Sequence, residues 1–284
     1  MSCPDCFRGH DHVGTPTGTE TELHGLRTYV TEPPPDASRR PDSSVIVIIS
    51  DAFGWSTVNL RMLADSYARR LGCRVYLPDF MDGTAMPAWV KIIIDRIIAE
   101  RGLWAWIMKP ILVLQAARFI IPFSSRNHPP KRYGLIQQFI AALRADLMAT
   151  ATQANSKTQA QPRIGAIGFC WGAYGVTHLS SESSKPLVDA AYVAHPSEVK
   201  VEDFAGIKVP FSMVIGDVDF AMKIEQVREV DKLLGENKGV ETEVTIIPNA
   251  RHGFAVRGNP NDQGEKEMAD QAEDAAVRWF AKHL

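Results

Sequence analysis

The sequence predicts an α/β fold in which helices cover both faces of a mostly parallel central sheet. Two observations lead to this prediction. Short runs rich in β-branched residues alternate with longer stretches of helical periodicity, which is typical of parallel strands joined by helical crossovers. The clearest strand, VIVIIS at 45–50, is a continuous apolar run, as expected for a strand buried on both sides.

The other elements follow in alternation along the chain. Further strands are expected at 74–77, 163–167, 190–194, 211–215 and 243–247. Helical patterns lie at 60–71, 135–152, 173–180, 222–234 and 265–283. Tyr29 and Val30 indicate an early edge strand, and the Pro- and Ser-rich residues 33–44 after it are interpreted as a hairpin connection.

One segment is too long for an ordinary crossover between two strands. Residues 86–130 are therefore interpreted as a helical cap inserted into a single domain that spans 1–284, where the cap would shape a substrate pocket. The tryptophans of the cap are expected to pack as a core. The cap is also the most apolar part of the chain, but charged residues interrupt it too often for a membrane span of about 20 apolar residues.

Composition narrows the range of partners. The 284 residues carry a net charge of -2, so the chain has no overall positive field to hold a nucleic acid. We expect a small-molecule partner and no cofactor, and the oligomeric state stays open. The N-terminus is polar and lacks the apolar core of a signal peptide, so a cytoplasmic location is expected. Cys3, Cys6, His10 and His12 offer zinc ligands, but their spacing is tighter than in zinc fingers, and no bound metal is expected.

The strongest chemical motif is GFCWG at 168–172, between an apolar strand and a helical pattern. It matches the G-x-S-x-G nucleophile elbow of the α/β-hydrolase fold, with Cys170 in place of serine. The elbow is a strained turn, so Gly168 and Gly172 would let neighbouring backbone approach closely. A helix N-terminus favours thiolate over thiol, and the backbone N–H of Trp171 would receive an oxyanion. The alternative is a buried structural cysteine in a glycine-rich turn.

A nucleophile of this kind needs a base and an orienting acid. On this fold they follow the nucleophile in the order acid, then histidine. The strand at 211–215 ends near two carboxylates, of which Asp219 is preferred over Asp217 as the acid. His252, on the loop after the next strand, is the expected base. Three matches in the correct order favour a triad of Cys170, Asp219 and His252.

These motifs resemble the dienelactone hydrolase family, also called carboxymethylenebutenolidases. The shared residues are SDAFG at 50–54, GFCWG at 168–172, GDVD at 216–219 and HGFA at 252–255. The resemblance implies hydrolysis of a small lactone or ester, with an oxyanion hole formed by the backbone N–H groups of Ala52 and Trp171. It also implies that a carboxylate contacts the resting thiol. Asp51 stands at that position, where bacterial members have glutamate.

The residues that would select a substrate are less well defined. Bacterial members hold the substrate carboxylate with an arginine four residues after the histidine, whereas this chain has Val256 there, followed by Arg257. Arg257, His195 and Trp104 are the candidates for substrate contacts. Fungal members often act on polyketide-derived esters or lactones in secondary metabolism, and the opening residues 14–18 resemble theirs.

Two alternatives to hydrolysis stay open. One is a ligand-binding protein without catalysis on the same fold. The other is an enzyme that releases or cyclises a thioester-bound intermediate of polyketide metabolism.

Overall fold

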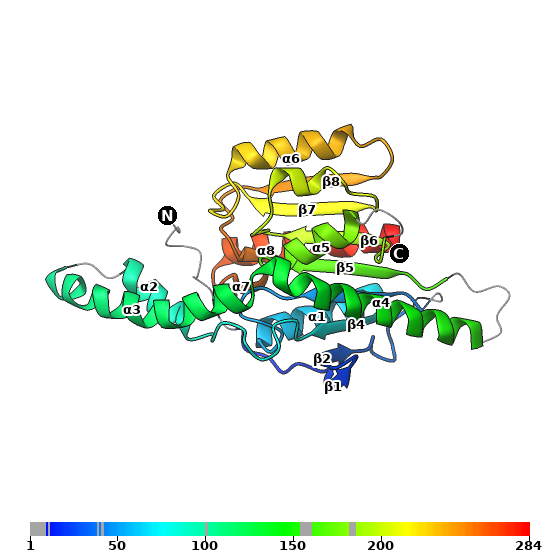
Figure 1. The fold of residues 1–284 in the computed structure, drawn as a ribbon, viewed down its shortest axis with the longest axis horizontal. Helices are drawn as coiled ribbons and strands as arrows, with labels where there is room; N and C mark the ends of the chain where they lie inside the picture. Colours follow the sequence, from blue (N-terminus) through cyan, green and yellow to red (C-terminus); the bar gives the residue numbers. More distant parts are fainter. Residues whose placement is uncertain are drawn as a thin grey trace.

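An eight-stranded sheet forms the centre of the molecule (Figure 1). The computed structural model describes residues 10, 12–38, 40, 43–99, 102–153, 161–181 and 186–284. Within them the strand order is β1-β2-β4-β3-β5-β6-β7-β8. The pairs from β4 through β8 are parallel, and the β1–β2 and β2–β4 pairs are antiparallel. The predicted α/β fold with a mostly parallel sheet is therefore confirmed.

Most elements form where the apolar patterns predict them. The strands that follow predictions are β3 (Val45–Ile49), β4 (Arg74–Pro78), β5 (Ile164–Phe169), β6 (Ala190–Ala194), β7 (Phe211–Gly216) and β8 (Thr242–Ile247). The helices that do so are α1 (Val58–Leu71), α4 (Pro129–Gln153), α5 (Gly172–Ser181), α6 (Ile224–Glu236) and α8 (Gln263–His283). Two short helices, η2 (Val201–Phe204) and α7 (Phe254–Arg257), have no counterpart among the predicted elements.

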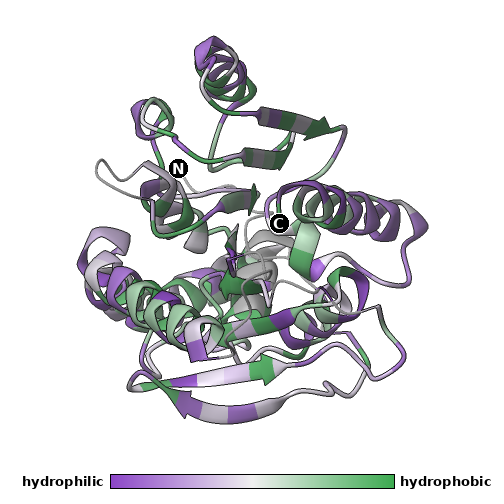
Figure 2. Cartoon of the chain, turned by 90° about the vertical axis from the view of Figure 1, so that its right-hand side faces the viewer, coloured by the Kyte–Doolittle hydropathy of each residue, from purple (hydrophilic) through white to green (hydrophobic). Residues whose placement is uncertain are grey.

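The side chains of β3 alternate between two cores. Val45, Val47 and Ile49 pack on the side of α4, α5 and α6. Ile46 and Ile48 pack on the side of α1 and α8. All five are buried, which is why this strand needs a continuous apolar run. In Figure 2, hydrophobic residues are frequent in the central strands, and hydrophilic residues are frequent in the outer helices and loops.

The first two strands correct the prediction for this region. The early strand is β2 (Leu26–Thr31), but β1 (Thr19–Leu23) pairs with it and forms the edge of the sheet. A two-residue turn at His24 and Gly25, both with positive φ, joins them as in a type I′ hairpin. Residues 33–44 are not a hairpin connection, because β2 pairs with β4 and the chain continues to β3 on the other side of β4.

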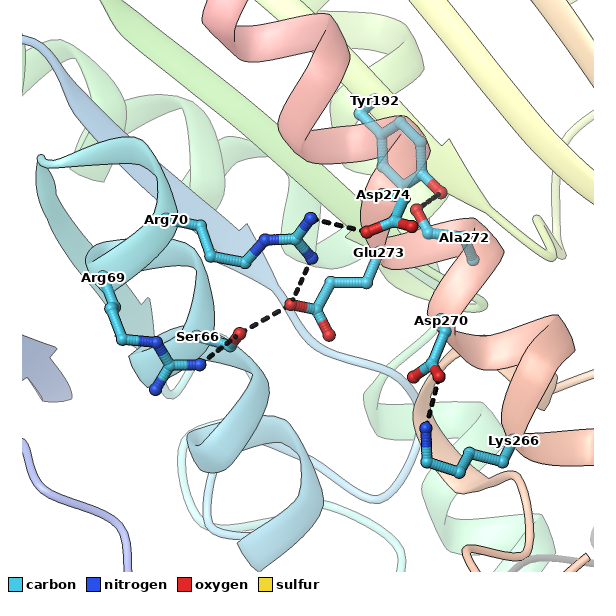
Figure 3. A network of polar contacts seen from close by, with 9 residues as sticks. All are labelled: Ser66, Arg69, Arg70, Tyr192, Lys266, Asp270, Ala272, Glu273 and Asp274. Carbon is cyan, nitrogen blue, oxygen red and sulfur yellow. Dashed lines mark hydrogen bonds and ion pairs between the residues drawn. The ribbon is translucent and has the colours of Figure 1, made fainter. Parts of the chain in front are cut away.

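A polar network ties α1 to α8 on one face of the sheet (Figure 3). Arg70 of α1 donates to Glu273 and Asp274 of α8, at 2.8 and 2.5 Å, and Ser66 donates to Glu273 at 2.6 Å. Beneath them the buried Tyr192 of β6 donates to a backbone carbonyl of α8 at 2.8 Å. The surface ion pairs stabilise little on their own, so the network mainly fixes the position of α8.

The chain between β4 and α4 forms two helices that project from the body (Figure 1). α2 (Val90–Ala99) packs against α3 (Leu103–Arg126), and we call this pair the α2–α3 hairpin. The expected core of cap tryptophans is wrong, since Trp104 and Trp106 are 74% and 77% exposed. α3 is apolar around its circumference, so burying one side leaves the other in solvent.

The α2–α3 hairpin also contains a helix that meets a simple test for a membrane span. The stretch Trp104–Arg126 has a mean hydropathy of 1.4 in its most apolar window, only 11% of which is buried. By length and composition alone it could therefore cross a membrane. Two prolines, Pro110 and Pro122, lie inside the helix without ending it.

Gly172, at the start of α5, tests how closely that helix meets the sheet. A Cβ at this position would lie 2.2 Å from the carbonyl oxygen of Ile49, a backbone atom of β3 that cannot easily move aside. We expect Gly172→Ala to destabilise the fold by about 1–3 kcal/mol and to lower the melting temperature in a thermal denaturation experiment.

The matched control is Gly235→Ala near the end of α6. Nothing lies within 4 Å of the Cβ that this substitution adds, and alanine favours helix more than glycine. Its melting temperature should equal or exceed that of the wild type. Equal melting temperatures for the Gly172 and Gly235 variants would contradict the close contact between α5 and β3.

Candidate active site

Cys170 occupies a strained turn between β5 and α5. Its φ of 49° lies in the left-handed region, which a non-glycine residue rarely adopts. The glycines on either side make the turn possible: a Cβ on Gly168 would lie 2.8 Å from the carbonyl oxygen of Gly172. The Cys170 N–H donates to the carbonyl of Ala194 in β6 at 3.2 Å, which anchors the turn to the next strand. This geometry is that of the predicted elbow, in which a sharp turn joins the carboxyl end of β5 to the start of α5.

Two neighbours of the elbow were not singled out from the sequence. The Oγ of Ser197 lies 3.4 Å from the Sγ of Cys170, and the Ser197 N–H donates to the Cys170 carbonyl at 3.1 Å. The indole N–H of Trp171 donates to the carbonyl of Asn127 at 2.5 Å. A polar residue just beyond the strand next to the elbow was the available signal for Ser197. Asn127 follows α3, and no sequence signal linked it to Trp171.

His252 and Asp219 meet at the same edge of the sheet. The Nδ1 of His252 lies 2.9 and 3.0 Å from the two carboxylate oxygens of Asp219, and both side chains are buried. Asp219 also accepts from the N–H of Ala221 at 2.8 Å, which fixes its rotamer. The competing carboxylate, Asp217, instead accepts from the backbone N–H of Asn249 at 2.7 Å. The structure therefore brings Asp219, and not Asp217, to the imidazole.

The bond to Asp219 leaves the Nε2 of His252 for the thiol. Within the described residues, Nε2 has no partner in standard hydrogen-bond geometry, so its contact with Cys170 is a loose one. Catalytic hydrogen bonds are often long in structures without substrate and tighten when substrate binds. The two groups are nevertheless close enough for each to shift the pKa of the other.

The charges in the site favour an ion pair between thiolate and imidazolium. Burial raises the pKa of the Cys170 thiol, but the charge and hydrogen bond of His252, with the charge of Arg257, together outweigh burial, and the pKa falls below its usual value. Burial lowers the pKa of His252, yet the charge on Cys170 and the hydrogen bond with Asp219 raise that pKa to about 9. The positive charge of Arg257 also lowers the pKa of the thiol, whereas Asp51 raises it.

Asp51 makes different contacts from the one that the family resemblance implies. Its carboxylate forms a buried ion pair with Arg257, whose guanidinium also lies over the ring of Phe53, 4.9 Å from the centroid. The two side chains are only 1% and 5% exposed. The other carboxylate oxygen accepts from the Phe53 N–H at 3.0 Å. Within the described residues, Asp51 therefore bonds to Arg257 and its own loop rather than to the thiol.

The oxyanion-hole candidates lie on the two loops that meet at Cys170. Ala52 is held by the Asp51 turn, and its carbonyl accepts from Met86 at 2.9 Å. Trp171 is the residue after the nucleophile. In the part of the chain that the structure describes, the backbone N–H of neither Ala52 nor Trp171 bonds to another protein group. Both donors are therefore available to a bound oxygen.

Two candidates for substrate contact lie elsewhere than expected. His195 is fully buried, with its ring 5.0 Å from that of His252 and 5.9 Å from that of Phe254. Burial, with the charge of His252, lowers its pKa well below the usual value, so the ring is neutral. It packs against His252 and Phe254 and has no exposed surface. Trp104 is on the exposed surface of α3, away from the elbow.

Over the described part of the chain, neither a metal site nor the cavity beside β2 coincides with this constellation. Among the described residues, no three His, Cys, Asp or Glu side chains group as metal ligands. Cys3 and Cys6 lie outside the described residues, and the ring of His12 bonds to the carbonyl of Gly258 at 2.9 Å. A cavity of about 1030 Å³ lies between β2, α1 and α8, and none of the three triad candidates lines it. The site is therefore defined by its chemistry and not by this cavity.

Known proteins resemble this chain over almost its whole length. The hydrolase tropI of Talaromyces stipitatus is 27% identical to it, over 100% of this chain and 96% of that protein. The carboxymethylenebutenolidase homolog of Mus musculus is 24% identical, over 99% of this chain and 97% of that protein.

Solved structures with the same fold include two hydrolases. A dienelactone hydrolase of Anabaena variabilis superposes with a TM-score of 0.54 and 13% identity, over 94% of this chain and 97% of that one. A serine hydrolase without a lid, from Xanthomonas campestris, gives 0.53 and 14% identity over 94% and 97%. A family model matches residues 26–284, nearly the whole chain. On this match, the chain belongs to the dienelactone hydrolase family.

Proposed function

We propose that this protein hydrolyses a small, uncharged ester or lactone through a Cys170 thiolate, with His252 as base and Asp219 as the orienting acid. One observation carries the proposal: a buried His252–Asp219 pair lies close enough to a thiol to lower its pKa. A pair with these properties is what a cysteine nucleophile requires. The family match supports ester or lactone hydrolysis as the reaction.

In the proposed mechanism, the Cys170 thiolate attacks the acyl carbon, and the carbonyl electron pair moves onto oxygen. The N–H groups of Ala52 and Trp171 stabilise that oxyanion. When it collapses, the carbon–oxygen bond breaks, and the imidazolium of His252 gives its proton to the leaving alkoxide. A water molecule, deprotonated by His252, then cleaves the thioester, which releases the acid and restores the thiolate.

The contacts of Arg257 support an uncharged substrate. Its guanidinium would be the cation that attracts a substrate carboxylate, yet a buried ion pair with Asp51 already balances it. An anionic substrate would have to displace a carboxylate that is 1% exposed, which leaves a buried charge without its partner. Uncharged polyketide-derived esters or lactones would meet this requirement, and the same chemistry is compatible with a cytoplasmic enzyme of secondary metabolism.

Replacing the nucleophile gives the first test. Cys170→Ala removes the only proposed covalent step, so turnover of a neutral aryl ester should fall at least about a thousandfold. Cys73→Ala is the matched control, since Cys73 is a buried thiol in the core on the α1 side and should leave turnover almost unchanged. Thermal denaturation would check that both variants fold. Full activity of a folded Cys170→Ala variant would rule out the mechanism. A folded wild type that turns over no ester would instead favour a ligand-binding protein.

The ion pair predicts how Cys170 reacts with iodoacetamide as pH changes. In the wild type, the lowered pKa keeps thiolate present near neutral pH, so alkylation should be fast there. His252→Gln removes the imidazolium, while burial still raises the thiol pKa, so the midpoint should move to higher pH. Each unit of that shift lowers the rate at pH 7 by about tenfold. The modified peptide would be quantified by mass spectrometry, and an unchanged midpoint in the variant would contradict the thiolate–imidazolium pair.

Charge selectivity tests the substrate class. We expect the wild type to have a higher kcat/KM for an aryl butyrate than for the aryl hemisuccinate, which carries a carboxylate. Asp51→Asn frees the charge of Arg257 and should reduce that preference by about tenfold. The preference is a ratio, so a smaller folded fraction does not affect it.

The control is Asp217→Asn, a nearby carboxylate that bonds backbone instead of Arg257. Its preference should match that of the wild type. A wild-type preference for the hemisuccinate would show that Arg257 serves the substrate despite its ion pair.

A further inference from the structure

The outer face of α3 is an exposed apolar surface. Residues at intervals of three and four along a helix share one face. The apolar residues that share the outward face are Trp104, Ile107, Ile111, Leu114 and Ile121, and each is about half exposed or more. Trp106 and Val113 widen the stripe. A contiguous patch of this kind on a soluble protein marks a binding surface.

The opposite side of α3 is fixed to the body of the protein. Ala105, Leu112 and Ala116 are buried, and Ala116 belongs to a small core with Phe53, Met86 and Val90. The exposed stripe therefore belongs to an anchored helix and is not a loose segment that could turn its apolar side inward. None of the residues that the structure describes covers the stripe, which leaves it open to a partner of the chain.

The charges on and near α3 indicate which kind of partner covers its exposed face. Between Glu100 and Asp146 the sequence has no acidic residue, although the whole chain has a net charge of -2. Within that stretch, α3 itself carries Lys109, Arg118 and Arg126. Arg144 on α4 is already paired with Asp189 and does not count toward this charge. Two copies of the chain paired through α3 would bring these like charges together, at a cost. An anionic lipid surface would instead attract them.

The geometry favours lying on a bilayer over crossing it. Both ends of the α2–α3 hairpin return to the body, because α2 follows β4 and α4 packs on the sheet through Ile136, Phe139 and Ile140. α2 has ten residues, about 15 Å of helix, which is half of a bilayer core of about 30 Å. Tryptophans such as Trp104 and Trp106 are enriched at the level of the lipid headgroups.

We propose that the outward face of α3 binds the surface of an anionic lipid bilayer, with its tryptophans and aliphatic side chains in the interface and its basic side chains at the headgroups. The residues on either side of the hairpin contact the site: Asn127, directly after α3, accepts from Trp171, and Met86, before α2, donates to Ala52. Docking would therefore hold the Cys170 end of the sheet near the bilayer. Access to membrane-dissolved esters is a consequence that rests on the proposed hydrolase function, whereas lipid binding does not.

Vesicle flotation of the full chain tests lipid binding without reference to activity. The chain should float with phosphatidylcholine vesicles that contain phosphatidylglycerol, and less with phosphatidylcholine alone or at high salt. The double variant Trp104→Ser with Trp106→Ser should lower the partition coefficient by about tenfold or more. Arg118→Gln and Arg126→Gln should each lower it by about fivefold. All four side chains are exposed, so these variants should fold.

Two substitutions elsewhere serve as matched controls. Ile246→Ser on β8 removes an exposed aliphatic side chain, and Lys232→Gln on α6 removes an exposed charge. Both should float like the wild type. If the wild type stays unbound to both kinds of vesicle, the proposal is wrong. If size-exclusion chromatography shows a dimer that the double tryptophan variant breaks, the stripe binds a second copy, which also overturns it.

Discussion

The close approach of α5 to the carboxyl end of β3 is the contact on which the rest of the site depends. Gly172 lies where any side chain would strike the carbonyl of Ile49, and Gly168 lies where one would strike Gly172. Because both residues are glycines without a side chain, the chain can reverse sharply, with Cys170 at a positive φ between strand and helix. Backbone bonds to Ala194 and Ser197 then hold the turn against β6. The thiol is thus positioned by backbone packing, and the surrounding charges only have to set its protonation.

The charged side chains around the thiol are buried, and each is paired with one of opposite charge. His252 pairs with Asp219 on one side of the thiol, and Arg257 pairs with Asp51 on the other. A buried charge without a partner would be costly. Each residue of a pair therefore mainly keeps its own partner ionised and in place, and the pair adds little to the stability of the fold. Their effects on the thiol differ, since His252 and Arg257 lower its pKa and Asp51 raises it. The loop at 51–54 therefore contributes twice, through the N–H of Ala52 and through a carboxylate that holds Arg257 in place.

Sequence patterns anticipate what depends on local chemistry. The apolar strand at 45–49, the glycines of the elbow and the order of acid and histidine all leave local signals, and the corresponding elements occur where expected. β1 leaves no such signal, because its sequence TETEL is polar. This strand forms because a two-residue turn joins it to β2, with which it pairs. The Asp51–Arg257 pair joins residues 206 positions apart, so no local pattern reveals it. Ser197 likewise reaches Cys170 only through the parallel pairing of β5 and β6.

The α2–α3 hairpin shows why apolar composition alone does not determine burial. An apolar sequence predicts a packed core when other elements can surround it, as they surround β3. α2, the small Phe53 cluster and, through Phe123, the margin of the main core meet α3. Among the described residues, none covers its other side. The charges of α3 indicate what covers this exposed side. The helix carries basic residues and no acidic ones, which opposes pairing with a second copy and favours an anionic lipid surface. Because the same segment is bonded to the elbow at Trp171, whatever covers α3 also sets the surroundings of the thiol.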